Sequence, residues 1–133
     1  RDTGEFILEE RKKFSSSDFE VKGRQNFVTH VDKGAEEKLV DGFSQLLPGA
    51  GFITEEGTAG NSGEQWQWII DPIDGTKSFI CGAQSFGTLI ALLKNGRPVL
   101  GVINQPILNE FLIGDGITAE LNGVPTNVRD CNK

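Results

Sequence analysis

The sequence predicts an α+β protein in which an antiparallel β-sheet packs against two helices. Two segments in the first third of the chain carry apolar residues at helical spacing. The remainder is a succession of short apolar runs, two of them followed by the turn dipeptides Asn95-Gly96 and Asn122-Gly123. Asn-Gly between apolar runs is typical of a tight β-hairpin. Because the 133 residues contain no long linker, we expect a single domain over residues 1–133.

The first helix is predicted over Glu5–Phe14, where the apolar side consists of Phe6, Ile7 and Phe14. Three consecutive serines, residues 15–17, are expected to end it. The next segment, FEVKGRQNFV at residues 19–28, is expected to form two short strands joined by a turn at Gly23.

The second helix is predicted to begin at Thr29 and to end before Pro48-Gly49. Asp32 follows Thr29 by three residues in a capping-box-like arrangement, so its spacing alone predicts a capping role. One face of this helix is apolar and consists of Ala35, Leu39, Val40, Phe43, Leu46 and Leu47.

Strands are predicted along the rest of the chain. They are GFIT (51–54), WQWIID (66–71), SFGTLIALL (85–93), PVLGVINQ (98–105), EFLIG (110–114) and TAELNGVPTNV (118–128). A polar loop, TAGNSGEQ at residues 58–65, is expected between the first two.

The bulk composition restricts the partners of the protein. A formal net charge of -6 argues against nucleic acid and against anionic membrane surfaces as main partners. No apolar run is long enough to span a bilayer, and no signal-peptide pattern opens the sequence. Cys81 and Cys131 match no metal-binding spacing and are too few for a disulfide framework, so we expect a reducing, cytoplasmic setting. An acidic protein that binds a phosphorylated substrate needs a local positive charge, and a divalent cation usually supplies it.

Carboxylates gather where predicted strands end. Glu55 and Glu56 follow FIT, and Asp71 and Asp74 close the run WIIDPID. The two aspartates stand three residues apart across a proline turn, so both can point into one pocket, and the carbonyl of Ile73 is available between them. Hard divalent cations such as Mg²⁺ prefer oxygen ligands of this kind. The pattern therefore predicts a Mg²⁺ site, to which Glu55 comes from the neighbouring strand.

Gly75 and Thr76 directly follow these aspartates. Their backbone N–H groups suit a phosphate oxygen, because glycine permits close approach. Asp-Pro and Asp-Gly are also ordinary turn dipeptides, which explains either Asp71 or Asp74 taken alone. The combination with Glu55, Glu56 and Thr76 favours a metal site over a simple turn.

Two similar motifs are excluded by spacing. GTKS (75–78) lacks the preceding glycine of a nucleotide-binding P-loop. DPIDGT (71–76) resembles the D-x-D-G-T signature of haloacid-dehalogenase-type phosphatases, but its two aspartates are one residue too far apart. The difference favours a metal-activated water over a phosphoaspartate.

Three motifs taken in order resemble the inositol monophosphatase superfamily of Mg²⁺-dependent, lithium-sensitive phosphate-monoester hydrolases. They are VTHVDKGAEEKL (28–39), FITEEG (52–57) and WIIDPIDGTKSF (68–79). The hairpin region 96–114 and LNGVP (121–125) are also similar, so the resemblance covers nearly the whole chain.

The resemblance implies a fold equivalent to the amino-terminal half of the layered αβαβα arrangement of that family. Family chains continue into a second α/β half, where a Trp-Asp motif completes the second metal site. We therefore expect residues 1–133 to be a fragment that lacks this carboxy-terminal half. Family members are commonly homodimers, so a homodimer is the implied assembly.

The resemblance also implies roles for individual residues. Glu55, Asp71, Asp74 and the carbonyl of Ile73 would bind metal, with Asp71 bridging two ions. Glu56 would hold a metal-bound water. The backbone N–H groups of Gly75 and Thr76 would bind phosphate. Thr76 would also act with Asp32 to orient the attacking water. That last role replaces the capping role that spacing alone gives Asp32.

The implied substrate is a small phosphate monoester. GTKSF followed by FGTLIALL and GVINQP is more similar to histidinol-phosphate phosphatases, since inositol-phosphate enzymes more often show Thr-Asn where Lys77-Ser78 stand. The motifs VTHVDKGAEEKLVDG and FITEEGTAGNSGE are instead similar to bacterial inositol-monophosphatase-like proteins. We favour histidinol phosphate, with inositol 1-phosphate as the alternative. A non-catalytic, truncated metal-binding domain is the second alternative.

Overall fold

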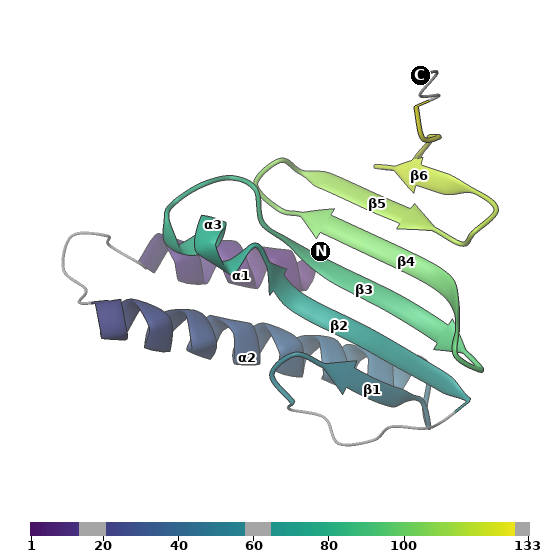
Figure 1. Ribbon diagram of the computed structural model, residues 1–133, viewed down its shortest axis with the longest axis horizontal. Helices are drawn as coiled ribbons and strands as arrows, with labels where there is room; N and C mark the ends of the chain where they lie inside the picture. Colours follow the sequence, from purple (N-terminus) through teal and green to yellow (C-terminus); the bar gives the residue numbers. More distant parts are fainter. Residues whose placement is uncertain (14–20, 58–64, 130–133) are drawn as a thin grey trace.

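The structure is a computed structural model that describes residues 1–13, 21–57 and 65–129. Within these described residues, three helices and seven strands follow one another (Figure 1): α1 (Asp2–Lys13), α2 (Val21–Leu46), β1 (Gly51–Thr54), β2 (Trp66–Asp74), α3 (Thr76–Ile80), β3 (Gly87–Lys94), β4 (Arg97–Gln105), β5 (Glu110–Gly114), β6 (Ala119–Leu121) and β7 (Val124–Pro125). None of the helices in these described ranges has both the length and the apolar character that crossing a membrane requires.

The seven strands form one sheet in which spatial order equals chain order. Every neighbouring pair from β2 to β7 is antiparallel, as predicted. The first pair is the exception, because β1 runs parallel to β2. Both predicted hairpin turns are confirmed: Asn95 and Gly96 have φ of 50° and 77°, and Asn122 and Gly123 have φ of 52° and 81°. These left-handed conformations suit the twist of a two-residue hairpin.

The prediction for residues 19–28 was wrong, and so was the predicted start of the second helix. Where two strands were expected, α2 runs without interruption from Val21 to Leu46. The reason is visible in the spacing of Val28, Val31 and Ala35, which extends the apolar face of the helix toward its amino end and buries all three side chains.

Thr29 is therefore an interior residue of α2. Its hydroxyl donates to the carbonyl of Gln25, one turn earlier, at 2.9 Å. Asp32 also lies inside the helix and is buried, so the capping role that spacing predicted for it was wrong. The predictions for Phe14, for the three serines and for most of the polar loop lie outside the described residues.

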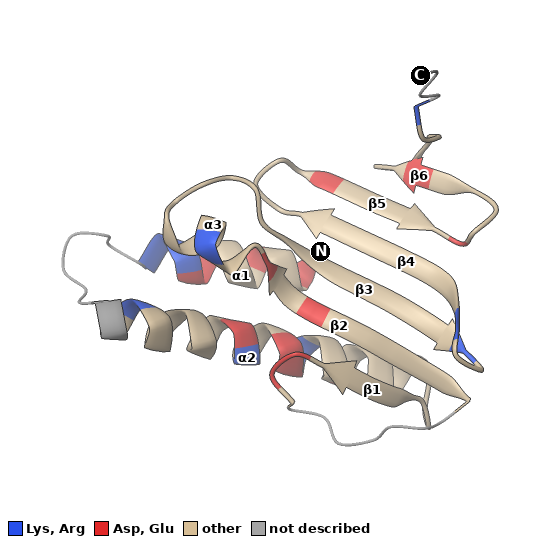
Figure 2. Ribbon diagram, in the orientation of Figure 1, with Lys and Arg blue, Asp and Glu red and all other residues tan. Residues whose placement is uncertain are grey.

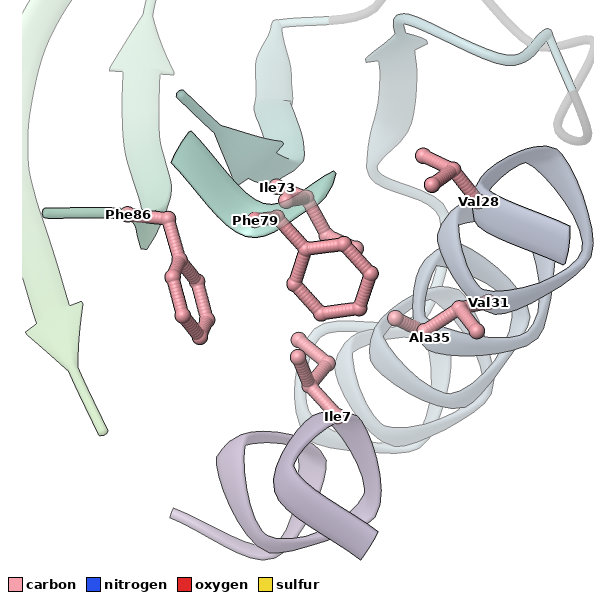
Figure 3. Close-up of a cluster of buried hydrophobic side chains, with 7 residues drawn as sticks. All are labelled: Ile7, Val28, Val31, Ala35, Ile73, Phe79 and Phe86. Carbon is pink, nitrogen blue, oxygen red and sulfur yellow. The ribbon is translucent and has the colours of Figure 1, made fainter. Parts of the chain in front are cut away.

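A first core cluster joins the two long helices to the segment around α3 (Figure 3). Its buried members are Ile7, Val28, Val31, Ala35, Ile73, Phe79 and Phe86. The rings of Phe79 and Phe86 meet edge to face, with centroids 5.2 Å apart. Burying side chains of this size stabilises a fold by roughly 1.5–3 kcal/mol each. The predicted phosphate-binding turn is thus attached to the core from both sides, by Ile73 before it and Phe79 after it.

A second cluster holds α2 against one face of the sheet. Ala50, Phe52, Trp68 and Ile70 are its buried members, and the ring of Phe43 stacks on Trp68 at 4.1 Å. The opposite face of the sheet is partly open, where Ile69 and Ile103 keep 38% and 39% of their surface exposed.

Candidate active site

The parallel pairing of β1 with β2 brings two of the predicted ligands together. The last pair of the register is Thr54 with Ile70, and the next residue in each segment is an acid: Glu55, which directly follows β1, and Asp71 in β2. Because parallel strands end at the same edge of a sheet, the two carboxylates become neighbours. Figure 2 shows acidic residues after the end of β1, on β2 and along α2.

A bulge in β2 separates Asp71 from Asp74. Asp71 pairs with Leu89 and Asp74 with Gly87, so the register shifts between the two aspartates. Pro72 has no N–H to give to the ladder. Its carbonyl instead accepts a hydrogen bond at 2.9 Å from the hydroxyl of Thr88, which is buried. The bulge leaves Asp71 partly buried and Asp74 exposed.

Gly75 makes the turn that follows. Its φ of 86° and ψ of 39° place it in the left-handed region, and a Cβ there would come within 2.8 Å of the Ser85 carbonyl oxygen. Glycine is required on both counts. The short helix α3 begins directly after it and was not predicted. The hydroxyl of Thr76 donates to the carbonyl of Ile73 at 3.1 Å, and this bond connects the predicted phosphate-binding turn to the predicted metal-ligating carbonyl.

Asp32 faces this region from α2. Its side chain is only 4% exposed, and among the described residues no group hydrogen-bonds to its buried Oδ1. Burial is the main cause that raises the pKa of Asp32 to about 7, and the charges of Glu56, Glu55, Asp71 and Glu36 raise it further. A carboxylate with this pKa can gain or lose a proton near neutral pH.

Asp71 is perturbed in the same direction. Burial, the contact with the side chain of Glu55 and the charges of Glu55 and Asp74 raise the pKa of Asp71 to about 6, against an opposing backbone hydrogen bond from Ile73. Its Oδ1 is also buried without a hydrogen-bond partner in the described part of the chain. The acidic residues of α2, β1 and β2 therefore share one electrostatic environment.

A cleft of about 370 Å³ lies among these elements. Four of the predicted site residues line it: Asp32, Glu55, Glu56 and Thr76. Asp71 instead borders a hollow on the open face of the sheet, beside Leu89 and Ile103. Within residues 1–13, 21–57 and 65–129, no three Asp, Glu, His or Cys side chains already form a ready metal-ligand set. The ligand assignments of Glu55, Asp71, Ile73 and Asp74 thus stay predictions.

The donor set nevertheless suits a hard divalent cation. The pKa values of Asp32 and Asp71 are raised, and each has a buried oxygen without a hydrogen-bond partner among the described residues. A nearby positive charge would stabilise the ionised form of both carboxylates. The described residues that line the cleft include no Lys or Arg to supply that charge.

Two residues that support the site were not predicted. Thr88 holds the bulge through Pro72, and Glu36 accepts the backbone N–H of Glu56 at 2.9 Å. A signal for Glu36 existed in the sequence: Asp32 and Glu36 stand four residues apart within the apolar stripe that contains Val28 and Ala35. An acid in such a stripe is buried, and a buried acid needs a partner.

Known proteins are similar to this chain in sequence. Residues 1–133 match the family described as the inositol monophosphatase family. The chain is 45% identical over 126 residues to the bifunctional phosphatase IMPL2, chloroplastic, of Arabidopsis thaliana, covering 92% of this chain and 36% of that protein. It is 45% identical over 102 residues to a histidinol-phosphatase of Chlorobaculum parvum, covering 76% of this chain and 39% of that protein.

Solved structures share the fold. An inositol monophosphatase from Zymomonas mobilis superposes with a TM-score of 0.78 at 35% identity, covering 98% of this chain and 51% of that one. The chain therefore spans between about a third and a half of the length of these relatives.

Proposed function

Since this chain belongs to the inositol monophosphatase family, we propose that it carries catalytic residues of a Mg²⁺-dependent phosphate-monoester hydrolase. The observation that carries the proposal is the group of carboxylates at Asp32, Glu55, Glu56 and Asp71 beside the Gly75-Thr76 turn. Burial and the neighbouring charges raise the pKa values of Asp32 and Asp71 within this group. Bringing like charges together destabilises a fold unless a bound cation or a proton offsets the repulsion.

In this proposal the carboxylates of Glu55, Asp71 and Asp74 and the carbonyl of Ile73 hold Mg²⁺. When bound, the ion would supply the positive charge that offsets the substrate phosphate and lowers the pKa of an attacking water. Ile73 can serve although its carbonyl accepts the Thr76 hydroxyl, because a carbonyl oxygen has two lone pairs.

The remaining residues position the reactants. The Asp32 carboxylate and the Thr76 hydroxyl, which line the same cleft, orient the attacking water, and the carboxylate can accept its proton. Glu56 accepts a hydrogen bond from a second water. Backbone N–H groups of Gly75 and Thr76 donate to the phosphate. The attack is in line and forms no covalent intermediate with the protein.

Histidinol phosphate is the substrate that we propose. The support is the motif GTKSF and the 45% identity to a protein named histidinol-phosphatase. Inositol 1-phosphate is the second candidate, favoured by the 35% identity to an inositol monophosphatase of matching fold. A homodimer and a reducing compartment such as the cytoplasm belong to the same proposal.

The test is Mg²⁺-dependent phosphate release from histidinol phosphate and inositol 1-phosphate, measured side by side. Asp74→Asn removes one proposed ligand at an exposed position, so we expect it to abolish turnover while the chain stays folded. Asp41→Asn, the same change at an exposed position of α2, is the matched control and should keep wild-type turnover. Full activity in Asp74→Asn would contradict the ligand assignment. A folded wild-type chain that binds Mg²⁺ without turnover would support the non-catalytic alternative.

A further inference from the structure

Glu36 is a buried acid outside the set of predicted site residues. It lies on α2, its side chain is 0% exposed, and its Oε2 accepts the backbone N–H of Glu56 at 2.9 Å. The other buried polar side chains of the described residues are Asp32 and Thr88. All three therefore lie at the acidic site or directly behind it.

Burying a carboxylate usually destabilises a fold relative to burying an apolar side chain. Removing an ionised group from water is strongly unfavourable unless hydrogen bonds replace its hydration, and an apolar side chain of similar size often gives a more stable fold. The location of Glu36 therefore points to a role other than core packing. That location is one helical turn from Asp32, on the same side of α2.

The segment that Glu36 holds is the one that carries two of the acids. β1 ends at Thr54, so the sheet no longer supports Glu55 and Glu56 through ladder hydrogen bonds. Both acids face the like charge of Asp32, and Glu55 also faces that of Asp71. Without an anchor, this repulsion would drive the segment outward. The hydrogen bond from Glu56 N–H to Glu36 opposes that movement at the backbone, which leaves both acidic side chains free to bind.

We propose that Glu36 is a positioning residue that fixes the Glu55–Glu56 segment, so that its carboxylates meet a divalent cation in place. It touches neither substrate nor cation and acts through the backbone of Glu56. This inference rests on the proposed function for the identity of the ligand, whereas the anchoring contact itself does not depend on it.

The first test uses the wild-type chain alone. Amide hydrogen exchange followed by NMR should show the Glu56 N–H protected, although it lies beyond the end of β1. Rapid exchange of this amide, at the rate of an open loop, would overturn the anchor whether or not the chain binds Mg²⁺.

The second test compares variants by Mg²⁺ calorimetry. Glu36→Gln keeps a carbonyl oxygen that can accept the Glu56 N–H, so we expect Mg²⁺ affinity within about threefold of wild type. Glu36→Leu removes the acceptor and should lower Mg²⁺ affinity about tenfold or more, the usual effect of losing a group that orients metal ligands. Glu37→Gln, an exposed neighbour on the same helix, is the control and should bind as wild type.

Equal losses in the Gln and Leu variants, or unchanged affinity in a folded Glu36→Leu chain, would contradict the positioning role. If Glu36→Leu does not fold, the pair Glu36→Gln and Glu36→Ala gives the same comparison. Failure of the wild-type chain to bind Mg²⁺ would instead count against the proposed function, and a protected Glu56 amide would still support the anchor.

Discussion

At the scale of single residues, the site depends on acids whose environment differs from that of ordinary surface carboxylates. Asp32 is the clearest case, because it is almost fully buried and has an unpartnered oxygen inside a helix. Glu36, one turn away, is more deeply buried but holds a backbone N–H. In our proposals the two acids therefore have different roles: Asp32 faces the ligand, and Glu36 stabilises the segment that carries Glu55 and Glu56.

The raised pKa of Asp32 predicts a pH dependence of stability in the absence of divalent cations. Below a pH of about 3.8 the residue is protonated in both the folded and the unfolded chain. Between that value and about 7 the unfolded chain releases the proton while the folded chain keeps it, so the free energy of unfolding falls as the pH rises. Above 7 both states are ionised and this contribution stays constant.

Urea unfolding in EDTA at pH 5 and pH 8 measures this effect. Relative to Asp32→Asn, whose side chain does not titrate, we expect wild type to lose more than about 1.4 kcal/mol between the two pH values, the equivalent of one pKa unit. If the free energy of unfolding changed with pH equally in the two chains, the pKa of Asp32 would not be raised in the folded state.

At the scale of elements, the bulge in β2 determines where two of the acids point. A regular strand would alternate its side chains, so residues three apart would lie on opposite faces. The register shift between Asp71 and Asp74 breaks this alternation, and the Thr88 hydroxyl satisfies the Pro72 carbonyl within it. The bulge is thus supported from the neighbouring strand β3.

Thr88→Val tests the support of the bulge. The substitution keeps the shape but leaves the buried Pro72 carbonyl without its donor, so we expect a loss of about 1–3 kcal/mol in the free energy of unfolding. Thr118→Val makes the same change at an exposed position, where the hydroxyl donates to the Asp115 carboxylate at 3.3 Å and water can replace it, so this variant should stay within about 0.5 kcal/mol of wild type. Chemical denaturation of both variants provides the measurement. Equal stabilities would mean that the bulge holds without this hydrogen bond.

At the scale of the whole molecule, the acidic site joins segments that are far apart in the chain. Asp32 belongs to α2, Glu55 follows β1, and Asp71 and Asp74 belong to β2. A cluster of buried side chains from α1, α2, β2 and the segment around α3 lies beneath them. A cation bound there would therefore connect elements that must all separate when the chain unfolds.

Mg²⁺ is accordingly expected to raise the melting temperature of the whole chain. Binding to the folded state alone adds about 2.7 kcal/mol at a Mg²⁺ concentration one hundred times the dissociation constant. For a domain of this size that corresponds to a rise of roughly 10 °C. Thermal unfolding with and without EDTA checks it, with Asp74→Asn as the variant that should lose the rise. An equal rise in that variant would assign the effect to Mg²⁺ bound elsewhere.

The sequence by itself determined the features that depend on a few adjacent residues. Asn95-Gly96 and Asn122-Gly123 predict their hairpins because the backbone preference of each dipeptide is local, and the apolar runs predict the strands beside them. The motif from Asp71 to Thr76 likewise predicts a turn that carries acids. Together with Glu55 and Glu56 it also predicts a metal site, whereas the catalytic role of Asp32 needed the resemblance of three motifs taken in order.

Only the tertiary structure decided which acids share an environment. The spacing of residues predicted a capping role for Asp32 and two strands over residues 19–28, and both predictions were wrong. The true start of α2 lies next to Gly23 and polar residues, so the local sequence there gives little indication of a helix. The parallel direction of β1, which places Glu55 beside Asp71, depends on contacts across the sheet. The burial of Asp32 and Glu36 depends on how α2 packs. Electrostatic coupling acts through space between distant segments, so folding of the chain has to bring those segments together before the coupling exists.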